Sequence, residues 1–129
     1  MKNTFVQKFL LIAAFGLFTQ FAVAQDANSA AAKQIADIVA SLNHFPSDAD
    51  KTTLNAIIAD SSLAAGIHAM ASAVVNIQHA ATAEGKAAMA ALQANDMAPD
   101  PAKALAGIIA SINHTASADA KAQLAQLFP

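Results

Sequence analysis

Apolar residues recur at helical spacing along this chain, and the pattern returns every 35 residues. In each copy a first segment has apolar positions at i, i+3, i+4 and i+7, which form one face of a helix. This face consists of Ile35, Ile38, Val39 and Leu42, then Met70, Ala73, Val74 and Ile77, then Leu105, Ile108, Ile109 and Ile112. The spacing predicts three amphipathic helices in equivalent positions of a threefold internal repeat.

A second apolar stripe follows in each copy and predicts a second helix. Its registers hold Leu54, Ile57 and Ile58, then Met89, Leu92 and Gln93, then Leu124, Leu127 and Phe128. Before each of these segments stands a residue suited to an N-cap, namely Ser47, Thr82 or Ser117. An acid in the following turn complements the positive end of the helix dipole, and Ser47 with Asp50 resembles a capping box. Each copy therefore reads as helix, turn, helix.

The predicted fold is all-α, with six short helices in three tandem hairpins over about 31–60, 62–95 and 101–129. Residues 25–30 are expected to be a loose lead-in. Between the hairpins, Asp60-Ser61-Ser62 and Asp100 are expected to cap the helices that follow, with Pro101 as the first helical residue of the third hairpin. Helices of about twelve residues are marginal alone, so the hairpins must stack, either as an open α-α array or as a compact bundle. The small residues Ala36, Ala71 and Ala106 would permit close helix contact.

The first 24 residues have the pattern of a secretory signal peptide. Lys2 and Lys8 are basic, residues 9–18 form an apolar run, and Ala22-Val23-Ala24 is a small-x-small cleavage site. Cleavage between Ala24 and Gln25 would leave a protein that is periplasmic or secreted. Its five lysines and nine acids would give a net charge of −4. No later segment approaches the length of a membrane span.

The absent residue types weigh against several functions. The sequence contains no Cys, Trp, Tyr or Arg. Without cysteine there is no disulfide, thiol nucleophile or thiolate metal site. Without arginine and stacking aromatics, and with an acidic balance, we expect no binding of nucleic acid.

Three histidines, His44, His79 and His114, occupy equivalent positions after the first helix of each copy, and an amide residue precedes each one. One interpretation is structural: histidine can interact with the last carbonyls of a helix, and Asn and His tolerate unusual turn angles. The other is a zinc or copper site, which requires that the three imidazoles converge. An open array would separate them by about 10 Å and exclude a shared metal. His68 lies in the register of Lys33 and Lys103 and is expected on the surface.

Catalysis has little support in the sequence. Ser41 with His44 superficially suggests a nucleophile and a base, but no motif supplies an orienting acid or an oxyanion hole. We therefore expect no enzymatic activity. The favoured function is an exported helical-repeat module that binds or scaffolds a protein or peptide, with homo-oligomerisation possible, because helical arrays present extended faces. The alternative is a metal-binding or metal-buffering protein that uses His44, His79 and His114.

Overall fold

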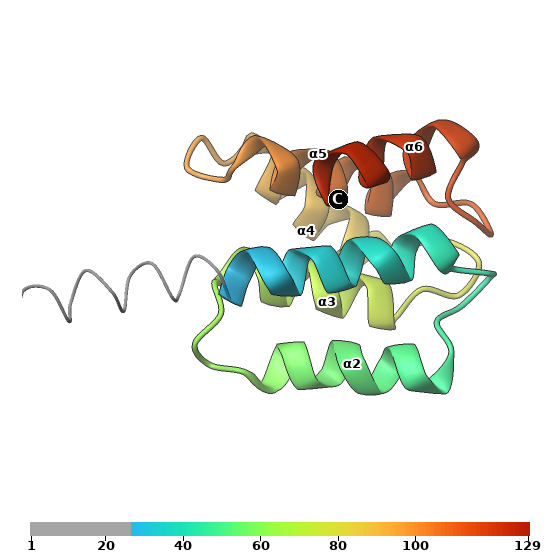
Figure 1. Ribbon diagram of the computed structural model, residues 1–129, viewed down its shortest axis with the longest axis horizontal. Helices are drawn as coiled ribbons and strands as arrows, with labels where there is room; N and C mark the ends of the chain where they lie inside the picture. The colour runs from blue at the N-terminus through green and yellow to red at the C-terminus, as the bar shows by residue number, and fades with distance from the viewer. Residues whose placement is uncertain (1–26) are drawn as a thin grey trace, which may run out of the picture.

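The computed structural model describes residues 27–129, and this part of the chain folds into six helices (Figure 1). The predicted signal peptide, residues 1–24, lies outside the described residues. The described part of the first helix covers residues 27–41. The others are α2 (Asp48–Ala59), α3 (Ala65–Val75), α4 (Ala83–Ala94), α5 (Asp100–Ser111) and α6 (Ala118–Leu127). None of these helices combines the length and apolar character needed to cross a membrane.

The apolar stripes form the core, as their spacing predicts. All twelve stripe positions of the first helices are buried, from Ile35 through Ile112. Ala36, Ala71 and Ala106 are buried beside them, so the small residues do lie in the core. The second helices bury fewer residues: Leu54 and Ile57 in α2, Gly85 and Met89 in α4, and Leu124 in α6.

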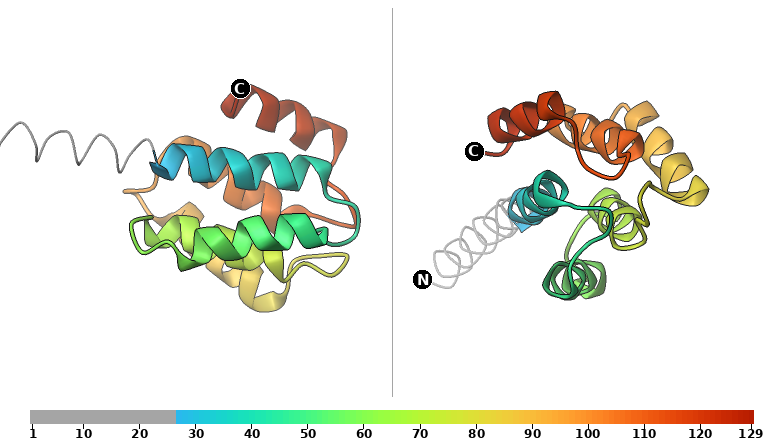
Figure 2. Two further views of the ribbon diagram at one scale, coloured as in Figure 1. Left: turned by 60° about the horizontal axis from the view of Figure 1, so that its bottom comes forward. Right: turned by 90° about the vertical axis from the view of Figure 1, so that its right-hand side faces the viewer.

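This difference in burial separates an inner set of helices from an outer set. Helix 27–41, α3 and α5 surround the middle of the molecule, and α2, α4 and α6 lie outside them (Figure 2, right). The inner helix α3 contacts α2, α4 and α5, and α4 contacts both α3 and α5. Three equivalent hairpins therefore surround a common axis, and the fold is a compact bundle rather than an open array.

The turns begin the outer helices as expected. The side chains of Ser47, Thr82 and Ser117 accept hydrogen bonds from the N–H groups of Asp50, Gly85 and Ala120, respectively, at 3.0–3.1 Å. In the first copy, Asp50 Oδ2 also accepts from the Ser47 N–H at 3.1 Å, which completes a capping box. These bonds satisfy amide groups that have no partner within the helix.

Three expectations about the connections differ from the structure. Residues 27–30 are helical, although they were expected to belong to a loose lead-in; alanine and neighbouring packing extend the helix through them. The N-cap of α5 is Pro99, so Asp100 and Pro101 are the first two helical residues, one position earlier than predicted. The N-cap of α3 is Ala64, because Asp60 instead ends α2 and binds Ser62 in a local turn.

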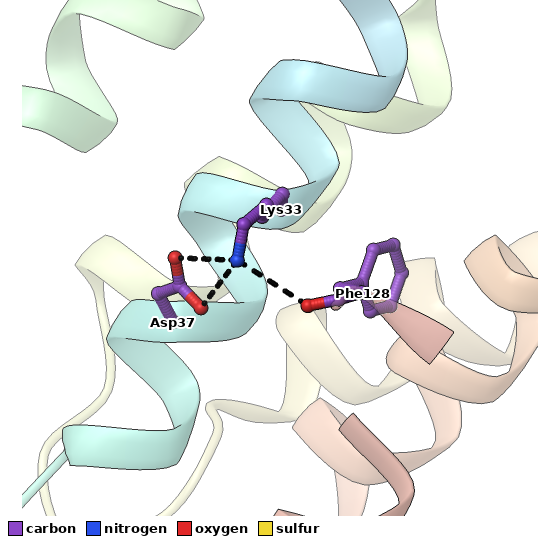
Figure 3. Close-up of polar contacts among 3 residues, drawn as sticks. All are labelled: Lys33, Asp37 and Phe128. Carbon is purple, nitrogen blue, oxygen red and sulfur yellow. Dashed lines mark hydrogen bonds and ion pairs between the residues drawn. The ribbon is translucent and has the colours of Figure 1, made fainter. Parts of the chain in front are cut away.

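A polar contact connects the first and third copies at the end of the chain (Figure 3). The Lys33 ammonium donates to the carbonyl oxygen of Phe128 at 3.3 Å and pairs with Asp37, one helical turn away, at 3.3 Å. The side chains of Lys33 and Asp37 are 45% and 64% exposed, so solvent screens the ion pair and it adds little stability. Its structural consequence is that the residue after α6 is held beside helix 27–41, so the first and third copies are connected.

Candidate metal centre

Each repeated histidine lies in a strained turn after an inner helix. His44, His79 and His114 have φ angles of 70°, 68° and 68°, and they are the non-glycine residues with positive φ in the described chain. In two of these turns the residue after the histidine donates its backbone N–H to the carbonyl oxygen of the residue before the histidine. Phe45 donates to Asn43, and Thr115 donates to Asn113, each at 2.8 Å. A three-residue turn of this kind with positive φ at its centre is a rare and strained γ-turn. Strained backbone at a repeated position indicates a candidate functional site.

The three turns meet in a closed cycle of backbone hydrogen bonds. The His44 N–H donates to the carbonyl oxygen of His114 at 2.6 Å, the His114 N–H to that of His79 at 2.5 Å, and the His79 N–H to that of His44 at 2.6 Å. Every histidine is therefore both donor and acceptor, with one partner in each of the other copies. The cycle fixes three backbone positions that are 35 residues apart in sequence around one point.

The side chains of these histidines converge as well. Their ring centroids are 5.2 Å apart for His44 and His79, 5.0 Å for His44 and His114, and 5.1 Å for His79 and His114. One ring nitrogen from each lies within 4.8 Å of the corresponding nitrogens of the other two. Zinc–nitrogen bonds of 2.0–2.1 Å in tetrahedral geometry require nitrogens about 3.4 Å apart. Ring rotations that shorten each nitrogen–nitrogen distance by at most about 1.4 Å would therefore complete the site.

Neighbouring groups favour a cation at this point. His44 Nδ1 lies 2.6 Å from Asn43 Oδ1. With that oxygen as acceptor, Nδ1 carries the hydrogen and Nε2 keeps its lone pair, which is the usual arrangement of a metal-binding histidine. The C-terminal ends of helix 27–41, α3 and α5 all precede the cluster. These ends carry partial negative charge, so three helix dipoles stabilise positive charge there.

Other residues singled out in the sequence lie outside the cluster or are otherwise occupied. The Ser41 hydroxyl donates to the carbonyl oxygen of Ile38 at 3.2 Å, and Ser111 does the same to Ile108 at 2.9 Å. These hydroxyls therefore bond back to their own helices and do not form nucleophile–base pairs with the histidines. His68 is partly exposed, and its Nε2 lies 2.8 Å from the carbonyl oxygen of Asp60.

Two hollows flank the bundle, and the sequence pattern did not reveal either. The larger, about 530 Å³, is mainly apolar and lies by the N-terminal ends of the inner helices, away from the histidines. Its lining includes Ile67 of the second copy together with Ala32 and Ala102, the smaller residues of the same register. The smaller hollow, about 370 Å³, is lined partly by His79. The sequence marks Phe45 as unusual, because the only other phenylalanine after position 24 is Phe128, but it does not show that Phe45 borders a hollow.

Comparisons with protein-family models, with characterised proteins and with solved structures give no significant match.

Proposed function

We propose that this protein binds a transition-metal ion, zinc or copper, through His44, His79 and His114. The observation that carries the proposal is the convergence of three imidazoles from strained turns in three separate repeats. A structural role for each turn accounts for one histidine at a time. The backbone cycle brings the three turns together, and the convergence of their ring nitrogens within 4.8 Å of one another is the feature that makes a shared ligand possible.

The ligand set indicates the class of metal. Imidazole nitrogens suit zinc, copper and nickel, and the Irving–Williams order places copper(II) as the tightest-binding divalent ion. Structural zinc sites use four protein ligands, whereas this cluster offers three, so a fourth position would remain open to an outside ligand. His79 and His114 are exposed. An exposed three-ligand site suits reversible binding, so the function we favour is metal binding or buffering, in the periplasm or outside the cell if the predicted signal peptide is cleaved.

The test is calorimetric titration of zinc and of copper(II) into the purified protein and a triple variant, His44→Asn, His79→Asn and His114→Asn. Asparagine tolerates positive φ, so it removes the imidazoles while retaining the turns. We expect one metal per chain in the parent and loss of saturable binding in the triple variant. The matched control, His68→Asn, should bind like the parent. Equal binding by the parent and the triple variant would overturn the proposal.

The larger hollow favours a second candidate function, binding of a protein or peptide. Its lining is mostly apolar, and Met97 beside it is 88% exposed. An apolar surface of this kind can accept a partner's side chain or a second copy of the chain. Analytical ultracentrifugation and binding of an apolar fluorescent dye test this candidate. We expect Ala102→Leu, which fills the hollow, to reduce the dye signal; a monomer whose dye binding is unaffected would argue against it.

A further inference from the structure

The smaller hollow borders the histidine cluster at one residue, because His79 both lines the hollow and belongs to the cluster. Its volume is about 370 Å³, and its other lining residues come from the first two copies: Phe45, Lys51, Val75, Asn76, Ile77 and Gln78. The hollow therefore lies between the start of α2 and the turn that follows α3. Its volume falls within the usual range of small-molecule sites.

Two residues distinguish this hollow from the equivalent positions of the other copies. The register of Phe45 holds Ala80 and Thr115 elsewhere, so this copy alone provides an aromatic wall. Phe45 is 58% exposed, so its side chain is accessible to a ligand. Lys51 is partly buried, whereas its equivalents Lys86 and Lys121 are exposed. The hollow thus combines one cationic group, one aromatic face and one histidine of the metal cluster.

We propose that a small organic carboxylate binds in this hollow and occupies the open coordination position of the metal. The inference rests on the proposed metal site. One carboxylate oxygen would coordinate the ion, since carboxylate oxygens are ordinary ligands of zinc and copper. The second oxygen would pair with the Lys51 ammonium. The carbon skeleton would lie against Phe45, whose ring offers an apolar face that an inorganic anion cannot use.

Charge balance agrees with this assignment. Three neutral imidazoles leave the full charge of a divalent ion uncompensated, and the cluster groups no carboxylate of the described chain with the histidines. Lys51 adds a further positive charge beside the hollow. An anionic ligand therefore completes both the coordination and the local charge, and the aromatic wall selects an organic one.

The test uses the full chain loaded with cobalt(II), whose visible spectrum reports a change of ligand at the metal. Benzoate, acetate and phosphate are titrated into the parent and into Phe45→Ala, Lys51→Gln and Lys86→Gln. We expect benzoate to bind about tenfold more tightly than acetate and more tightly than phosphate. Phe45→Ala should abolish the preference for benzoate, Lys51→Gln should weaken both carboxylates about fivefold, and Lys86→Gln should bind like the parent.

The outcomes separate the two proposals. Failure of cobalt, zinc and copper to bind would overturn the metal site and this inference with it. Stoichiometric metal binding with no spectral response to benzoate, or with equal responses to benzoate and phosphate, would overturn this inference alone. Equal carboxylate affinities of the Lys51→Gln and Lys86→Gln variants would also overturn this inference alone. Circular dichroism of each variant establishes that it is folded. We expect Phe45→Ala to fold because Phe45 lies on the surface.

Discussion

Each repeated histidine occupies a backbone region that L-residues rarely enter, because the β-carbon approaches the following carbonyl oxygen. The same residue also donates and accepts in the cycle of backbone hydrogen bonds. The backbone conformation and the imidazole therefore have separable roles. The backbone holds three repeats together, and the side chain supplies a potential ligand atom.

Two substitutions of His114, which both remove the imidazole, test the role of the backbone through the free energy of unfolding. Glycine accepts a φ of 68° without a steric penalty, whereas valine is β-branched and fits that region poorly. We expect His114→Val to unfold more readily than His114→Gly by about 1–2 kcal/mol in urea denaturation. Equal stability of the two variants would show that the turn relaxes out of the positive-φ conformation.

Asp60 provides a second prediction at the scale of one residue. The Ser62 hydroxyl donates to Asp60 Oδ1 at 2.6 Å and the Ser62 N–H donates at 3.0 Å. The hydroxyl, then the N–H, lower the pKa of the Asp60 carboxyl below its ordinary value. A lowered pKa means that the contribution to stability is present at neutral pH and is lost as the pH falls through the folded-state value. Carboxyl titration by NMR should show a higher pKa in Ser62→Ala; Ser61→Ala, the control, should leave it unchanged.

The helices were the most predictable level of the structure, because the signals that specify them are local. Helical spacing placed every stripe of the inner helices in the core, and Ser47, Thr82 and Ser117 marked the starts of α2, α4 and α6. The start of α5 was misplaced by one residue because aspartate is a good cap and proline is favoured in the first turn. Local preference alone did not distinguish Pro99 from Asp100 as the boundary.

Glycine within α5 permits a prediction at the scale of the helix. A β-carbon added at Gly107 would lie 2.7 Å from Gln93 Nε2, the end of a flexible and exposed side chain that can move away. Alanine is favoured over glycine inside helices, so we expect Gly107→Ala to raise the free energy of unfolding by about 0.5–1 kcal/mol. At Gly85 the same change would meet Thr82 Oγ1 at 3.2 Å, beside the N-cap bond of α4. The gain at Gly85 should be smaller; equal gains would contradict this account.

The closure of the whole molecule, and hence the site, was less predictable from the sequence. A repeat specifies each hairpin, but the same stripes serve a shallow array or a closed ring, since both bury them. The rotation between hairpins depends on contacts between different copies, such as α3 with α5 and Lys33 with Phe128. The equivalence of His44, His79 and His114 was visible in the sequence, whereas their convergence follows from closure. The amide–histidine pairs were a signal for the unusual turn conformation.

Because the candidate metal centre unites all three copies, metal binding should stabilise the whole fold. The unfolded chain separates these histidines, so a metal that needs all three binds the folded state preferentially. At a free concentration 100 times the dissociation constant, such linkage adds about 2.7 kcal/mol. For a domain of this size we expect the melting temperature to rise on the order of 10 °C when zinc or copper(II) is present.

The pH dependence of this stabilisation separates coordination at the imidazoles from nonspecific binding to the acidic surface. Only neutral imidazole coordinates a metal, so the increase in melting temperature should diminish as the pH is lowered below neutrality. Differential scanning calorimetry with and without the metal, at several pH values, measures this increase. The triple asparagine variant should show no increase at any pH, while His68→Asn should behave like the parent. An increase that persists in the triple variant would assign the bound metal to surface carboxylates and not to the three repeated turns.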